Sequence, residues 1–117
     1  MILALDRRIP DNVADLRAGQ WNKKEYSKAA GLYGRTLGLV GFGNSAKATA
    51  RRAQGFGLRV IATRRRMSAE DASAWGVELV DFDTLLTRSD YVSLHLPLVA
   101  DTYHLIDAKA LARMKPG

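Results

Sequence analysis

The stretch TLGLVGFGNSA, Thr36 to Ala46, joins a short apolar run to a turn that contains two glycines. An apolar run of five residues between glycines is typical of a strand buried on both faces. The turn has the pattern G-x-G-x-x-A, formed by Gly41, Gly43 and Ala46. In dinucleotide-binding folds, the first glycine makes the turn and the second lets the backbone approach a pyrophosphate. The third small residue lets the following helix pack against the strand.

Helix and strand patterns alternate after this turn. We expect strands at 58–63, 77–80 and 91–96, and helical segments at 44–54, 68–76, 81–89 and 107–114. Such alternation predicts an α/β fold with a parallel sheet, because parallel strands need crossover connections. The predicted architecture is a Rossmann-like sheet of about four strands in the order 3-2-1-4, with flanking helices and a preceding N-terminal helix.

The first 33 residues have a different pattern. Apolar side chains recur at helical spacing from Ile2 to Leu16, and Pro10 is expected to interrupt the helix before Gly19 ends it. Residues 20–33 have no clear period and are interpreted as a connecting arm. The sequence therefore predicts an N-terminal helix and arm at 1–33, and a partial dinucleotide-binding domain at 34–117.

Composition narrows the classes of function. The 117 residues are 47% apolar and 26% charged and include no cysteine, so disulfides and thiolate metal sites are excluded. No metal site is predicted. No apolar run approaches the roughly 20 residues of a membrane helix, so no membrane association is expected and a cytoplasmic location is the default. A net charge of +6 favours an anionic partner.

The residue that contacts the adenosine ribose is expected about twenty residues after the glycines, at the end of the second strand. Thr63 and Arg64 occupy this position, and Arg65 is a second candidate for phosphate contact. A carboxylate there would favour NAD, whereas the arginine fork matches a 2'-phosphate. The sequence thus favours NADP, with NAD as the alternative cofactor. The alternative interpretation is that these arginines form a solvated, charged loop without ligand contacts.

Several longer segments resemble the nucleotide-binding domain of the D-isomer-specific 2-hydroxyacid dehydrogenases, which include phosphoglycerate dehydrogenase and the glyoxylate/hydroxypyruvate reductases. They are RRIPDNVADLRAGQW, GRTLGLVGFGNSAKATARRAQGFGLRVIA, GVELVDFDTLLTRSDYVSLHLPLVADTYHLI and ALARMKPG. The resemblance implies that His95 and Pro97 lie near the nicotinamide side of the cofactor, and that Thr102 lies near its pyrophosphate or ribose. From spacing alone, His95 would be a structural histidine at a strand end.

The chain departs from the family's usual Arg-Ile-Gly after the second glycine, because Asn44, Ser45 and Ala46 stand there. We still place these three residues in the cofactor site, with an altered contact to the phosphates. Arg64 in place of the usual acidic residue implies NADP preference within the family.

The resemblance also implies that the family's catalytic arginine, glutamate and histidine lie outside this chain, which looks truncated at both ends. No residue here is predicted to be catalytic, and a 2-hydroxy acid is expected as a partner only in the complete enzyme. The open edge of the strand at 91–96 predicts a homo-oligomer. The alternative is a stand-alone module that binds a nucleotide or a protein. Nucleic-acid binding is disfavoured, since no recognition motif is present.

Overall fold

The computed structural model describes residues 1–64 and 68–116. The chain divides into two compact units, Met1–Tyr33 and Gly34–Gly117. The predicted phosphate contact of Arg65 lies outside the described residues.

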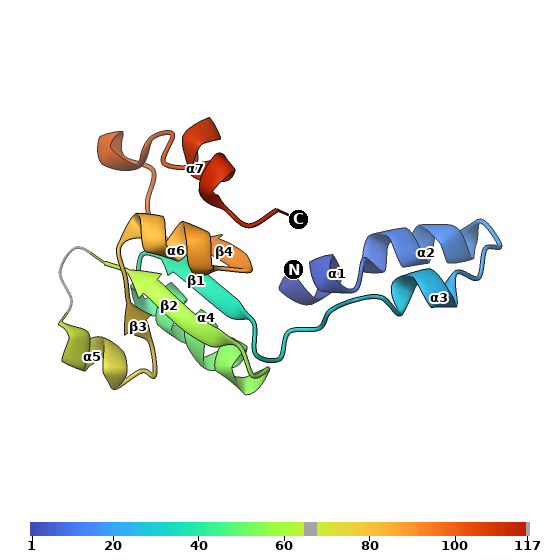
Figure 1. The fold of residues 1–117 in the computed structure, drawn as a ribbon, viewed down its shortest axis with the longest axis horizontal. Coiled ribbons are helices and arrows are strands. Elements are labelled where there is room, and N and C mark those ends of the chain that lie inside the picture. Colours follow the sequence, from blue (N-terminus) through green and yellow to red (C-terminus); the bar gives the residue numbers. More distant parts are fainter. Residues whose placement is uncertain (65–67, 117) are drawn as a thin grey trace. The chain divides into compact units, whose positions relative to one another are not determined.

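The second unit is built on a parallel sheet. Its strands are β1 (Thr36–Val40), β2 (Arg59–Thr63), β3 (Glu78–Leu79) and β4 (Tyr91–Leu94). They are arranged in the order β3-β2-β1-β4, with β1 paired to both β2 and β4 (Figure 1). The predicted sheet and its strand order are confirmed.

The helices of this unit are α4 (Asn44–Gly55), α5 (Ala69–Ser73), α6 (Phe82–Arg88) and α7 (Ala108–Arg113), with a 3-10 turn at Ala100–Thr102. Helices α4 and α6 lie on opposite faces of the sheet (Figure 1). Ser68 and Asp81 cap α5 and α6 by accepting bonds from the amides of Asp71 and Thr84. The Thr84 amide also holds the pKa of Asp81 below its usual range. Serine and aspartate are among the residue types most often found at this cap position.

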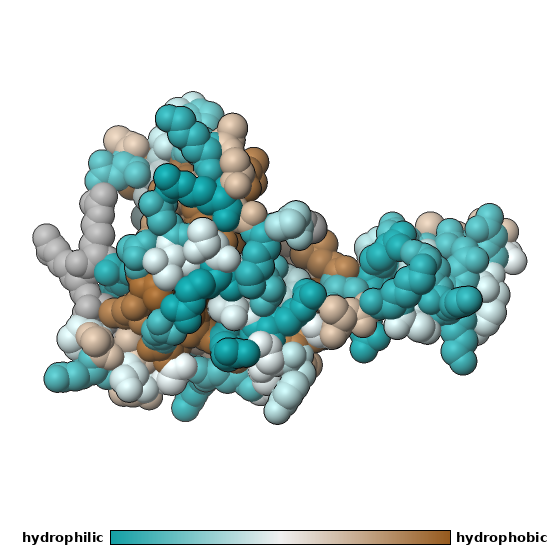
Figure 2. All heavy atoms as spheres, viewed as in Figure 1, coloured by the Kyte–Doolittle hydropathy of each residue, from teal (hydrophilic) through white to brown (hydrophobic). Residues whose placement is uncertain are grey.

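The core forms where the helices cover β1. Leu37 and Leu39 are fully buried, and a side chain added at Gly38 would overlap Leu85 and Ser89 of the α6 region. Glycine at this position therefore allows α6 to lie close to the sheet. In the view of Figure 2, apolar side chains gather over β2 and β3 and are surrounded by hydrophilic ones.

The fourth strand is shorter than the sequence indicated. It ends at Leu94, which is paired with Val40, the last residue of β1. One further bond joins the His95 amide to the Val40 carbonyl oxygen, at 2.8 Å. The expected continuation to Leu96 is wrong because β1 offers no further partner residues.

The first unit contains α1 (Ile2–Asp6), α2 (Ile9–Arg17) and α3 (Lys23–Tyr26). The predicted interruption is present, since Arg8 adopts a left-handed conformation with φ 49° just before Pro10. Helix α3 was missed, because the sequence indicated only an irregular arm over 20–33. No helix in the described part of the chain combines the length and apolar character needed to span a bilayer.

A tyrosine–carboxylate bond joins α3 to α2. The Tyr26 hydroxyl donates to Asp15 at 2.6 Å, and Asn22 donates to the same oxygen at 2.8 Å. The bond to Asp15 raises the pKa of Tyr26 to about 12. The same hydroxyl is the main cause that lowers the pKa of Asp15. The folded unit therefore favours neutral Tyr26 and ionised Asp15.

This bond predicts a late titration of Tyr26. Because the folded-state pKa is raised, the stabilising effect is present below the ordinary tyrosine pKa near 10 and is lost as the pH rises through about 12. Tyrosinate absorbance, taken as the difference between the protein and Tyr26→Phe, should show this transition. In Asp15→Asn the midpoint should fall toward the ordinary value, and an unchanged midpoint would contradict the assignment.

Candidate functional site

A groove of about 810 Å³ lies at the carboxyl ends of the strands. This edge of an open parallel sheet is where ligands of α/β proteins bind. Seven of the residues predicted from the sequence line it: Gly41, Gly43, Thr63, Arg64, His95, Pro97 and Thr102.

The fold restricts the two glycines of the turn differently: one position accepts only glycine, and the other could accept a side chain. Gly41 has φ +90°, and a Cβ added there would lie 2.7 Å from the His95 carbonyl oxygen and from Leu96. Gly43 has φ −89°, a conformation open to any residue, and an added Cβ would have no atom within 4 Å. The fold therefore requires Gly41. At Gly43, by contrast, the missing side chain leaves open space beside the start of α4.

The start of α4 presents unpaired backbone donors. The helix has no side-chain cap, and its first backbone bond runs from the Lys47 amide to the Gly43 carbonyl. In the described part of the chain, the amides of Ser45 and Ala46 consequently have no acceptor. Such amides, with the helix dipole, favour an anion. Ala46 is fully buried, as expected for the small residue that lets α4 pack on the sheet.

Asn44 and Ser45 do not line the groove. The Asn44 side chain lines a neighbouring hollow with Trp75, over whose ring Lys47 and Arg51 lie at 5.1 and 5.7 Å. Ser45 instead contacts His95, with 3.2 Å between its Oγ and the ring Nδ1. Both predicted side-chain roles in phosphate contact remain predictions.

Arg64 follows β2 at the edge of the groove. Its Nη1 donates to the Phe42 carbonyl oxygen at 2.9 Å, and the side chain is exposed. The Gly41 amide donates to the Thr63 carbonyl at 3.1 Å, which ties the same turn to the end of β2. Arg64 is thus held beside the glycine turn. The sequence could not indicate its bond to Phe42, since the acceptor is a backbone atom.

One side-chain hydroxyl bonds two backbone groups of the loop after β4. Thr102 Oγ1 donates to the Pro97 carbonyl at 2.6 Å and accepts from the Val99 amide at 2.9 Å. The groove also has apolar lining residues that were not predicted from the sequence: Val40, Phe42, Val80, Phe82, Leu96, Val99 and Leu105. Phe42, Val80 and Leu96 closely follow strand ends, which was the available signal, whereas Val99 and Leu105 lie further along the chain after β4. They make the groove suitable for a ligand with apolar rings.

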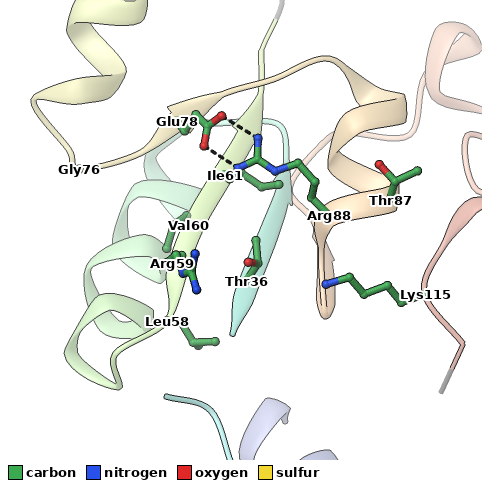
Figure 3. Close-up of a pocket in the computed structure, with 10 residues that line it drawn as sticks. All are labelled: Thr36, Leu58, Arg59, Val60, Ile61, Gly76, Glu78, Thr87, Arg88 and Lys115. Carbon is green, nitrogen blue, oxygen red and sulfur yellow. Dashed lines mark hydrogen bonds and ion pairs between the residues drawn. The ribbon is translucent and has the colours of Figure 1, made fainter. Parts of the chain in front are cut away.

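A second hollow, of about 600 Å³, lies at the opposite, amino ends of β1 and β2 (Figure 3). Arg88 binds both carboxylate oxygens of Glu78 there, at 2.7 and 2.8 Å, and lowers the pKa of Glu78. Lys115 is paired with Asp90 at 2.9 Å. Each of these pairs joins a cation to a carboxylate, and Arg59 also lines this hollow. Among the described residues, no cluster suited to hold a metal ion was found.

A parallel sheet ordered 3-2-1-4, a glycine turn that opens a helix, and a groove over the strand ends define a dinucleotide-binding domain of the Rossmann type. Residues 1–117 match the family described as D-isomer specific 2-hydroxyacid dehydrogenase, NAD binding domain, and the chain belongs to this family.

Two relatives illustrate the similarity in sequence. Glyoxylate reductase of Thermococcus litoralis is 45% identical over 123 residues, which cover 100% of this chain and 37% of the relative. Hydroxypyruvate reductase of Thermotoga maritima is 42% identical over 117 residues, with the same coverage of both chains. The chain therefore spans little more than a third of the length of these relatives.

Solved structures show the same fold. D-lactate dehydrogenase from Escherichia coli, in its apo form, superposes with a TM-score of 0.86 at 36% identity, covering 97% of this chain and 36% of that one. The apo form of Rhodotorula graminis D-mandelate dehydrogenase gives a TM-score of 0.89 at 35% identity, covering 100% and 36%.

Proposed function

We propose that this chain is the cofactor-binding part of an NADP-preferring dehydrogenase that transfers a hydride between the nicotinamide and a 2-hydroxy or 2-keto acid. The relatives named as glyoxylate and hydroxypyruvate reductases support this substrate class. The chain itself supplies the cofactor site. The groups that bind and protonate the substrate belong to the remainder of the enzyme, since the chain spans about a third of its relatives.

The observation that carries the proposal is the open space at Gly43. Neither the backbone conformation nor a neighbouring atom requires glycine there. A phosphate that approaches the amides of Ser45 and Ala46 would require it, because a Cβ would block that approach. Four further predicted site residues line the same groove: Arg64 after β2, and His95, Pro97 and Thr102 after β4.

Arg64 supports the preference for NADP. It follows the second strand, where a ribose-binding carboxylate would stand in an NAD enzyme. Among the described residues its guanidinium bonds only the Phe42 carbonyl, through Nη1, which leaves the other donors for a 2'-phosphate. The overall charge of +6 would add a weaker attraction for the more anionic cofactor.

We infer a cytoplasmic enzyme that acts as a homo-oligomer and binds neither nucleic acid nor membranes. Exposed apolar side chains along the edge of β4 and the loop after it, Leu94, Leu96 and Leu98, support association between copies. A monomer in sedimentation at high concentration would contradict this association.

Calorimetric titration with NADPH and NADH tests the proposed function. NADPH should bind roughly tenfold to 100-fold more tightly, because charge-assisted hydrogen bonds contribute about 1.5–3 kcal/mol. Equal or tighter binding of NADH would refute the NADP preference alone. Failure of both cofactors to bind would refute the proposed function.

A further inference from the structure

His95 connects the end of β4 to the first turn of α4. Its ring Nδ1 lies 3.2 Å from Ser45 Oγ, and its Nε2 lies 3.1 Å from Ser93 Oγ. Ser45 is the second residue of α4, and Ser93 is in β4. In a neutral imidazole one nitrogen donates and the other accepts, so both hydroxyls can be satisfied by one ring.

The backbone of His95 is fixed against the glycine turn. Its amide donates to the Val40 carbonyl at 2.8 Å, and its carbonyl oxygen would lie only 2.7 Å from a Cβ added at Gly41. The ring therefore reaches Ser45 from a point that the sheet itself holds in place. Ser45 has no other side-chain bond within the described residues.

We propose that His95 is a positioning residue, which sets the affinity of the site for a dinucleotide by holding Ser45 and, through it, the unpaired amides at the start of α4. The inference rests on the proposed function. Donors already fixed in place bind an anion more tightly than donors that must be ordered on binding. The isoleucine usual at the position of Ser45 in the family could not form this bond. The bond between His95 and Ser45 therefore depends on the serine by which this chain departs from the family pattern.

Two isosteric replacements separate the two contacts of the ring. The amide of asparagine takes the place of Nδ1, and the amide of glutamine takes the place of Nε2. Because the proposed effect passes through Ser45, His95→Asn should keep nearly the whole NADPH affinity. His95→Gln and His95→Leu should both weaken NADPH binding by roughly threefold to tenfold, the value of one net hydrogen bond. A purely structural histidine would not distinguish asparagine from glutamine in this way.

A double-mutant cycle for NADPH affinity completes the test. Ser45→Ala should weaken binding about as much as His95→Leu, and the double variant should be no weaker than either one, since both remove the same bond. Ser73→Ala and His104→Asn, both at exposed positions, serve as matched controls with unchanged affinity. Unfolding midpoints of every variant establish that the fold is retained.

Three outcomes would overturn the inference. Additive losses from Ser45→Ala and His95→Leu would show that His95 acts independently of Ser45, as a direct cofactor contact would. Equal behaviour of His95→Asn and His95→Gln would remove the specific role of Nδ1. Failure of the unmodified protein to bind NADPH or NADH would refute the proposed function together with the inference, whereas the first two outcomes leave the proposed function standing.

Discussion

Gly43→Val is expected to weaken NADPH binding by about 100-fold or more while the protein stays folded. The valine side chain would fill the open space beside the start of α4, where no protein atom lies within 4 Å of an added Cβ. A phosphate would then lose at least two charge-assisted bonds to backbone amides, about 3 kcal/mol in sum. Calorimetric titration measures the loss, and thermal unfolding measures the stability.

The stability of Gly43→Val should change little. The φ of −89° and ψ of −166° are extended values that valine adopts readily. Glycine is also the residue before α4, and its replacement by valine at this cap position costs about 1 kcal/mol or less. A large loss of stability would show that the fold, and not a ligand, requires this glycine.

Gly41→Ala is the matched control, and the opposite result is expected. Its φ of +90° strains any side chain, and the new Cβ would lie 2.7 Å from the His95 carbonyl oxygen. The strain alone costs about 1–3 kcal/mol, so the unfolding midpoint should fall clearly. Unchanged NADPH affinity in Gly43→Val, beside an unstable Gly41→Ala, would contradict phosphate binding at this turn.

The sheet could be predicted because its signals are local. Each strand lies in a short, mostly apolar stretch of the sequence, and the caps Ser68 and Asp81 stand at the starts of α5 and α6. Helix α3 could not be predicted in the same way. It has four residues, and Tyr26 at its end is bonded to Asp15 of α2, a contact that no periodicity reveals.

The sequence predicts where the site residues lie in the fold, but it does not predict which atoms their side chains contact. Parallel strands end at one edge of the sheet, so the residues after β1, β2 and β4 had to meet there. Which atoms they bind depends on side-chain geometry. The Thr102 hydroxyl bonds its own loop, and Ser45 turns toward His95. Neither bond has a signature in the spacing of the residues.

Arg64→Asp should reverse the cofactor preference. The aspartate would repel a 2'-phosphate and accept hydrogen bonds from a 2'-hydroxyl, the arrangement that favours NAD. We expect NADPH affinity to fall by roughly 100-fold, since a pair of charge-assisted bonds gives way to repulsion, while NADH affinity stays level or rises. Calorimetric titration of both cofactors against both proteins provides the four dissociation constants.

The ratio of the two dissociation constants isolates the 2'-phosphate. Arg64 also donates to the Phe42 carbonyl at 2.9 Å, so its loss loosens the glycine turn for both cofactors. That effect cancels in the ratio, because NADPH and NADH share every group except the phosphate. Arg59→Asp is the matched control: it makes the same change of charge at an exposed position at the amino end of β2. If Arg59→Asp shifts the ratio as far as Arg64→Asp does, the preference comes from the overall field of the protein and not from contact with Arg64.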